Sequence, residues 1–159
     1  MLNRRHLRIK VLQILYAFFQ TEDEDILKSE KELLTSIDRM YDLYLWFLLT
    51  FEEVQRFSAQ RIEDRMKKVR PTKDDLTPNR KFVDNKVIKL LLENNSLRRK
   101  SEEHKVNWTG AVEKDIMRKL FLQIVDSQLF QDYMESDEQS FDHDKEFILD
   151  LFKKEIANY

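Results

Sequence analysis

The stretch LLTSIDRMYDLYLWFLLTFEEV, residues 33–54, decides the fold class of this chain. Its apolar residues recur at steps of three and four, the spacing that places side chains on one face of an α-helix. The positions that carry this pattern are Leu33, Ile37, Met40, Tyr44, Phe47, Phe51 and Val54. No proline or glycine interrupts the chain from Ile26 to Val69, so we expect one very long helix, or two helices joined near Thr50.

The composition of the whole chain agrees with an all-α fold. Among 159 residues there are one glycine and two prolines, too few for the tight turns of a β-sandwich or the glycine-rich loop of a dinucleotide-binding domain. Charged residues make up 36% and hydrophobic residues 42%, a mixture typical of amphipathic helices. We therefore predict a helical bundle of about five helices, with a long second helix or helix pair.

The remaining helices are placed by apolar spacing and capping residues. We expect helices over residues 3–20, 78–93 with Thr77 as N-cap, 110–134, and 141 or 142 to 156. Residues 97–107 are interpreted as a short helix or a loop. In the first helix Leu7, Val11, Ile14, Leu15 and Phe18 form a stripe that we expect to be core, and residues 21–25 form an acidic turn after it.

These elements suggest a domain organisation. Residues 1–70 are predicted to hold the basic first helix and a long helical hairpin, residues 71–78 a proline-containing linker, and residues 79–159 further helices of the same bundle. The run Leu43–Leu49 is apolar all round, so it should be covered on more than one side. Either it is a central helix of the bundle, or part of its cover lies on a partner or on a piece of chain absent here.

Charge is strongly segregated along the chain although the net charge is only -2. Residues 1–20 carry four basic and no acidic side chains, and residues 61–105 carry fourteen basic and eight acidic ones. Residues 21–60 and 131–159 are acidic. A chain of this kind can present a positive surface, so the net charge does not exclude a nucleic-acid partner.

The first basic segment is placed against the helix dipole. Arg4, Arg5 and Arg8 fall in the first turns of the expected helix, where the dipole disfavours cations. Such a placement suggests a phosphate-binding role, because guanidinium groups bind phosphate oxygens in a bidentate way. Gln13 and Tyr16 fall outside the apolar stripe and offer an amide and a stacking ring, as expected for single-stranded RNA. The alternative is a solubilising N-terminus whose arginines pair with acidic residues.

The segment Arg4–Gln20 resembles the opening helix of the bacterial transcription antitermination factor NusB family. That family begins with an Arg-Arg-x-x-Arg segment that leads into Gln-x-Leu-Tyr, and often a later Gln. Here Arg4, Arg5 and Arg8 match the arginines, and Gln13, Leu15, Tyr16 and Gln20 match the rest. Ile9 and Lys10 depart from the usual Glu and small residue.

The resemblance implies an RNA-binding factor in transcription antitermination, termination and regulation. Members of the family pair with the small-subunit ribosomal protein NusE, bind the boxA element of nascent RNA and join an antitermination complex on RNA polymerase. Arg4, Arg5 and Arg8 would contact RNA phosphates, with Gln13 and Tyr16 as further RNA contacts. The Phe-x-Asn-Gly-Val-Leu-Asp-type signature of the family's C-terminal bundle is absent, so we expect the N-terminal portion of an extended member.

Other classes of function find no support in the residues. The chain has no cysteine, its single glycine excludes a Walker loop or a Gly-x-Ser-x-Gly motif, and the three histidines form no metal-binding pair. We therefore expect no enzyme, cofactor, metal or small-molecule substrate. No apolar run is long enough for a membrane span and no export signal is visible, so we expect a cytoplasmic protein. The rival hypothesis is a helical protein–protein interaction module that does not bind nucleic acid.

Overall fold

The computed structural model describes residues 3–21, 25–157 and 159. Within these residues the chain is all-α, with eight α-helices, one π-helical turn and no strand. The helices are α1 (Arg4–Gln20), α2 (Ile26–Met66), α3 (Lys73–Leu76), α4 (Lys86–Leu92), α5 (Asn95–Glu103), α6 (Ala111–Asp126), α7 (Gln128–Glu135) and α8 (Phe141–Leu151), which runs into the π-helical turn η1 (Phe152–Ile156). The all-α prediction is confirmed, whereas the number of helices is larger than the predicted five.

The chain divides into two compact units, residues 1–45 and 46–159, with the boundary inside α2. α2 is a single helix of 41 residues, which decides between the one-helix and two-helix alternatives. Thr50 does not break it, because the Thr50 hydroxyl donates to the carbonyl of Trp46 at 2.9 Å and so stays within the helical turn. The segment predicted as a linker, residues 71–78, contains the four-residue helix α3.

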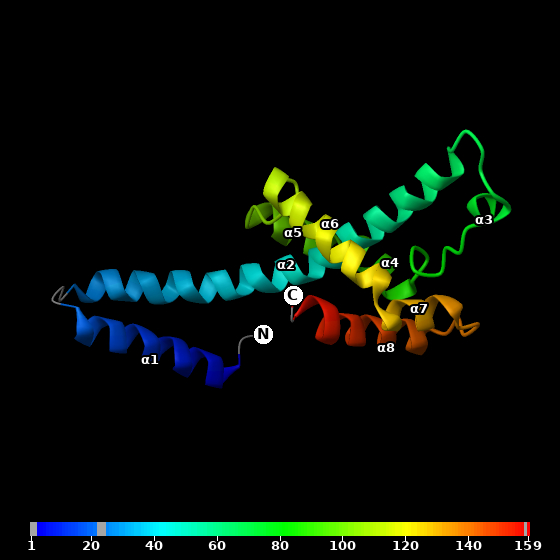
Figure 1. Ribbon diagram of the computed structural model, residues 1–159. Helices are drawn as coiled ribbons and strands as arrows, with labels where there is room; N and C mark the ends of the chain where they lie inside the picture. The colour runs from blue at the N-terminus through cyan, green and yellow to red at the C-terminus, as the bar shows by residue number, and fades with distance from the viewer. Residues whose placement is uncertain (1–2, 22–24, 158) are drawn as a thin grey trace. The chain divides into compact units, whose positions relative to one another are not determined.

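The first unit is a hairpin of α1 and the first part of α2, which run in opposite directions (Figure 1). Asn3 caps α1, and Asp25 caps α2 by accepting from the backbone N–H groups of Leu27 and Lys28. The rest of the predicted acidic turn, residues 22–24, lies outside the described residues. The prediction that the α1 stripe is core is wrong, since no residue of α1 is buried. Only one helix of this hairpin faces α1, and one neighbour cannot enclose its apolar side chains.

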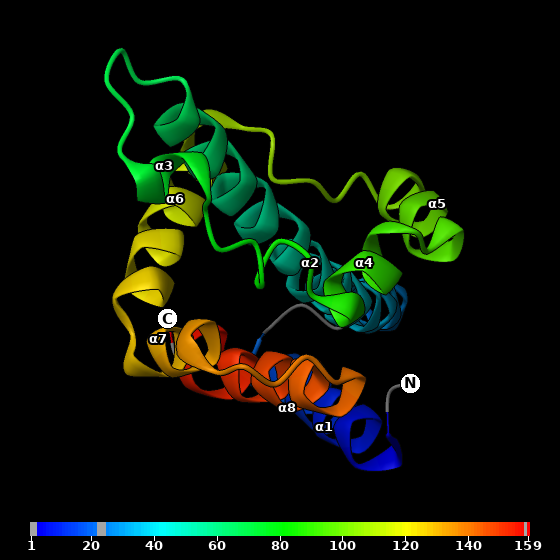
Figure 2. The ribbon, with the colours of Figure 1, turned by 90° about the vertical axis from the view of Figure 1, so that its right-hand side faces the viewer.

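The second unit has a continuous hydrophobic core. α6, α7, α8 and η1 pack on one another, and α4 packs on α8 (Figure 2). Phe57 of α2 stacks on Phe121 of α6 with ring centroids 5.8 Å apart, and Phe82 lies against Phe130 and Phe147 at 5.3 and 6.0 Å. These contacts bring residues of α2, the 82–88 region and the C-terminal helices into one apolar cluster.

Two predicted helices differ from the observed ones. The helix expected from Pro78 begins instead at Lys86, because the buried side chain of Asn85 caps it by accepting from Val87 and Ile88. The helix expected over residues 110–134 is broken at Ser127, whose extended backbone ends α6 and whose hydroxyl caps α7 by accepting from Phe130. The ambiguous residues 97–107 are mostly helical, in α5.

The apolar run Leu43–Leu49 is covered unevenly. Leu45 is 1% exposed, whereas Leu43 and Tyr44 are 52% and 54% exposed. Trp46 packs edge to face against Trp108 with centroids 4.4 Å apart, and Phe47 packs in the same way against Phe152 at 5.1 Å. The second unit therefore supplies its own cover for Trp46 and Phe47, and Leu43 and Tyr44 keep half of their surface accessible.

Candidate nucleic-acid interface

The start of α1 is built by one capping residue and three arginines. The side chain of Asn3 accepts a hydrogen bond from the backbone N–H of Arg5 at 2.6 Å, which fixes the first turn. The first turn holds no acidic residue. The positive potential of the helix dipole and that of the guanidinium groups of Arg4, Arg5 and Arg8 therefore combine at the same end of the helix.

All three guanidinium groups are accessible. Arg4, Arg5 and Arg8 are exposed, and none of them forms an ion pair with another residue that the structure describes. Three cations within two helical turns, without an ion pair among the described residues, can meet an anion without first breaking such a pair. This is the most concentrated group of unpaired charge of one sign on α1.

The two other predicted contact residues, Gln13 and Tyr16, are also exposed. Tyr16 is 68% exposed and Gln13 is exposed. Arg5 and Tyr16 are eleven residues apart, which places them about 20° apart around the helix and about 16 Å apart along it. Gln13 lies to one side of this line, whereas Arg4 and Arg8 lie to the other. Arg5, Gln13 and Tyr16 thus lie within an arc of about 80°, whereas Arg8 lies about 60° and Arg4 about 100° to the other side of Arg5.

The second basic segment, residues 61–105, differs in that many of its cations are engaged within the fold. Asp75 is 2% exposed, and its carboxylate accepts from Arg65 at 2.7 Å and from Lys68 at 3.1 Å. These donors, with Arg65 first and the Thr72 backbone next, hold the pKa of Asp75 far below its usual range. Similar pairs join Arg80 and Lys89 to Asp84, and Arg99 and Lys100 to Glu103.

Three further side chains of this segment hold the loop between α7 and α8. Asn79, Lys81 and Lys86 donate to the backbone carbonyls of Met134, Ser136 and Gln139 at 2.8, 2.5 and 3.0 Å. The ammonium group of Lys81 also lies over the ring of Tyr133, 4.6 Å from its centroid. Carbonyl groups at the end of one helix and before the next are thereby satisfied by side chains from residues 79–86.

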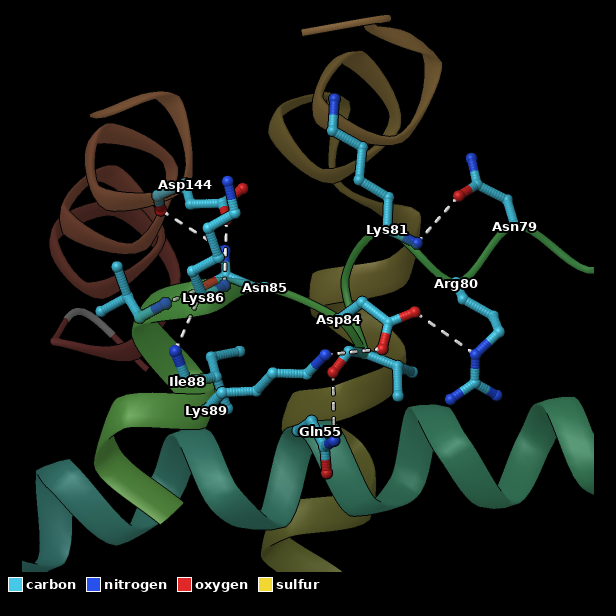
Figure 3. A network of polar contacts seen from close by, with 12 residues as sticks. Gln55, Asn79, Arg80, Lys81, Asp84, Asn85, Lys86, Ile88, Lys89 and Asp144 are labelled. Atoms are coloured by element: carbon cyan, nitrogen blue, oxygen red, sulfur yellow. Dashed lines mark hydrogen bonds and ion pairs between the residues drawn. The ribbon is translucent and has the colours of Figure 1, made fainter. Parts of the chain in front are cut away.

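Asn85, Tyr133 and Asp144 form a buried polar network, of which Figure 3 shows Asn85, Asp144 and the neighbouring Lys86. Asn85, 1% exposed, donates from Nδ2 to the hydroxyl of Tyr133 at 3.1 Å, and the Tyr133 hydroxyl donates to Asp144 at 2.7 Å. The backbone N–H of Lys86 donates to the other Asp144 oxygen at 3.0 Å. Burial, and the bond to Asp144, raise the pKa of Tyr133. Sequence reasoning missed this network; the signal for part of it was Asn85 directly before the apolar residues Val87 and Ile88, which is a capping position.

A polar cavity of about 300 Å³ adjoins the network. Arg80, Lys81 and Lys86 line it, together with the carboxylates of Asp84 and Asp144. The cations do not converge on one point: in Figure 3 the guanidinium of Arg80 lies beside Asp84 and points away from the ammonium of Lys81. Because each cation already has a partner and two carboxylates face the same space, this cavity is a weaker anion site than the start of α1.

Metal and membrane sites are not found in the described part of the chain. No group of three or more histidine, aspartate or glutamate side chains there is arranged to hold a metal ion. Among the same residues no helix is both long and apolar enough to cross a bilayer.

Comparison with known proteins gives no matching family model, no matching curated protein and no matching solved structure. A function for this chain is therefore inferred from its own residues and their geometry.

Proposed function

We propose that this chain is an RNA-binding protein of the NusB type, which holds single-stranded RNA along α1. The observation that carries the proposal is the exposed group Arg4, Arg5 and Arg8 at the positive end of the α1 dipole, which forms no ion pair within the described part of the chain. In this proposal the three guanidinium groups contact phosphates, which position the RNA without reading its sequence.

Gln13 and Tyr16 supply the contacts to bases. Tyr16 presents an open ring on which one base stacks, and the amide of Gln13 both donates to and accepts from a base edge. Gln13 and Tyr16 lie on the same side of α1 as Arg5. An RNA strand that runs along α1 from Arg5 toward Tyr16 would therefore contact the arginines with its phosphates first and Gln13 and Tyr16 with its bases next. A surface of this kind binds and positions RNA and performs no reaction.

The resemblance of Arg4–Gln20 to the NusB family adds a biological setting to the proposal. The RNA would be a boxA-type element, and the protein partner would be the ribosomal protein NusE within an antitermination complex on RNA polymerase. These partners rest on the family resemblance, whereas the RNA surface rests on the residues themselves.

The test is fluorescence anisotropy of a labelled boxA-type RNA titrated with the full chain, with and without NusE, against a scrambled RNA. We expect binding that prefers boxA and is lost in the R4A/R5A/R8A variant. Three phosphate contacts to a single strand predict a weakening of roughly 20-fold between about 50 and 200 mM salt. The scrambled RNA should show the same salt dependence at lower affinity, because phosphate contacts carry no sequence information.

The matched control is R61A/R70A/K73A, which removes the same charge from three exposed residues of the second basic segment. It should bind RNA as the unmodified chain does. Equal losses in the two triple variants would show that binding follows total charge and would overturn the assignment to α1. Absence of binding from the folded chain, with and without NusE, would favour the interaction-module hypothesis instead.

A further inference from the structure

The side of α1 that faces away from α2 carries apolar and aromatic side chains. Four half-buried residues mark the side toward α2, within an arc of about 80° around the helix: Leu7, Lys10, Ile14 and Phe18. Five exposed residues lie on the opposite side, within an arc of similar width, and form the outer face of α1: Arg5, Arg8, Leu12, Tyr16 and Phe19. A helix side that meets water ordinarily carries polar residues, so three large side chains in this position indicate a binding surface.

The outer face combines these side chains with positive charge. Arg5 and Arg8 lie in its first two turns, and α1 contains no acidic residue along its 17 residues. Rings that follow arginines along one helix face suit a single-stranded nucleic acid, because such a strand offers both phosphates and unpaired bases along its length. The charge therefore selects this occupant for the outer face.

Phe19 is the most exposed aromatic side chain of α1. It is 77% exposed, and Tyr16 is 68% exposed. Phe19 follows Tyr16 by three residues, which places the two about 4.5 Å apart along the helix and about 60° apart around it. Phe18 contacts the Phe19 ring edge to face, with centroids 5.5 Å apart and planes at 73°. This contact supports the Phe19 ring and leaves most of its surface open for stacking.

We propose that Phe19 is a second base-stacking residue, so that α1 holds two neighbouring unpaired bases of one RNA strand, one on Tyr16 and one on Phe19. This inference rests on the proposed RNA-binding function and adds to it a contact residue that the NusB-like motif does not contain. The arginines hold phosphates about 17–21 Å away along α1, at the other end of the bound segment. Two stacked bases require a strand that is unpaired at both positions.

The first experiment measures binding of a labelled boxA-type RNA to the full-chain variants Phe19→Leu and Phe19→Trp by fluorescence anisotropy. Phe19→Leu keeps an apolar side chain but removes the ring, so we expect binding to weaken roughly 10-fold. Phe19→Trp keeps a stacking ring and should bind at least as tightly as the unmodified chain. Because Phe19 is exposed, neither change should alter the helix content measured by circular dichroism.

The matched control is Phe141→Leu, the same change at a 44% exposed phenylalanine of α8 in the second unit. It should bind RNA as the unmodified chain does. Unchanged binding by Phe19→Leu, or an equal loss in Phe141→Leu, would overturn the role of Phe19. If R4A/R5A/R8A loses binding while Phe19→Leu keeps it, the proposed function stands and only this inference fails. If the unmodified chain does not bind RNA, both fail.

A second measurement tests for stacking itself. A base stacked on an indole ring quenches its fluorescence, so the RNA should quench the Phe19→Trp variant more than the unmodified chain. The two native tryptophans, Trp46 and Trp108, pack against each other and provide the constant background. The same RNA with two neighbouring bases removed at the stacked positions keeps its phosphates and should lose the additional quenching. Equal quenching of the variant and the unmodified chain would contradict stacking at position 19.

Discussion

Helices α1 and α6 are nearly equal in length, with 17 and 16 residues, and both show apolar residues at helical spacing. α6 buries Met117, Leu120, Phe121 and Ile124, whereas α1 buries no residue. The difference comes from their neighbours, since α6 packs against α7 and η1 and, through Phe121, against α2. Apolar periodicity therefore predicts that a segment is helical, and the number of helices around it decides whether it is core.

The same contrast holds for charge. In the second unit many cations of residues 61–105 pair with carboxylates such as Asp75, Asp84 and Glu103. In the first unit Arg4, Arg5 and Arg8 stand at the end of a helix with no described partner. Side-chain charges that already form ion pairs are held within the fold. Side-chain charges without an ion pair are accessible to a ligand. Substitutions in the two units test this division of the molecule.

The largest effect on stability should come from a core aromatic residue of the second unit. Phe82 is 0% exposed and lies in the aromatic cluster with Phe130 and Phe147. Phe82→Ala should lower the free energy of unfolding by about 3–5 kcal/mol, because it removes buried surface and leaves a cavity. Urea unfolding followed by tryptophan fluorescence measures this, since both tryptophans, Trp46 and Trp108, lie in the second unit.

The matched change in the first unit is Leu12→Ala, at a residue that is 68% exposed on α1. It should alter stability by less than about 0.5 kcal/mol, as exposed substitutions generally do. Circular dichroism in urea, on dilute protein, monitors the helices of both units. A loss from Leu12→Ala as large as that from Phe82→Ala would show that α1 is part of a core after all, and the comparison would fail.

Much of this contrast between α1 and α6 cannot be predicted from the sequence. The steps of three and four over residues 33–54 are enough to predict a helical chain and to leave one long helix as an option. Burial is not predictable, because the same periodicity occurs in α1 and α6 while burial depends on distant segments. The break at Ser127 and the late start of α4 depend on single side-chain caps, and many polar residues elsewhere form no such cap.

The residues of the candidate site, in contrast, can be identified from the sequence. Arg4, Arg5, Arg8, Gln13 and Tyr16 stand out in the sequence because their residue types conflict with or fall outside the needs of the helix, and all five are exposed. The Asn85–Tyr133–Asp144 network is not predictable, since its members are 48 and 59 residues apart along the chain from Asn85. The local sequence indicates that Asn85 is a helix cap. Only the tertiary structure shows that Asn85 also donates a buried hydrogen bond to Tyr133.

Asn85 therefore has two roles, and one substitution removes both. Asn85→Ala removes the α4 cap and also leaves the buried Tyr133 hydroxyl without its donor. We expect a loss of about 2–3 kcal/mol, from a cap worth about 1 kcal/mol and a buried hydrogen bond worth about 1–2 kcal/mol. The measurement is urea unfolding by tryptophan fluorescence.

The control is Asn94→Ala, which removes an exposed N-cap of α5 whose side chain accepts only from Leu97. It should lower the free energy of unfolding by about 1 kcal/mol. The difference between the two alanine variants isolates the buried part of the Asn85 interaction. Equal losses would mean that the bond to Tyr133 adds nothing, and that the network is held by Asp144 and the Lys86 backbone alone.

A further effect, expected to be smaller than that of Asn85→Ala, is a pH dependence at Asp75. Its pKa in the folded chain lies well below the ordinary value of 3.8, chiefly because Arg65 and the Thr72 backbone donate to the carboxylate. A lowered folded pKa means that the ionised carboxylate stabilises the fold fully above pH 3.8 and that this contribution is lost as the pH falls below it. Asp75→Asn keeps an acceptor for Thr72 but removes the charge, so its stability deficit relative to the unmodified chain should shrink between about pH 6 and pH 2.

The size of this deficit is limited by solvent around the two cations. Arg65 and Lys68 are half exposed, so water and salt weaken the pair, and the deficit should stay below that of Asn85→Ala. Unfolding at several pH values, with Asp74→Asn at the exposed neighbouring position as the control, tests this. A deficit that does not change with pH, or an equal change in the control, would show that the paired charges of the second unit contribute no more than the unpaired charges of the first.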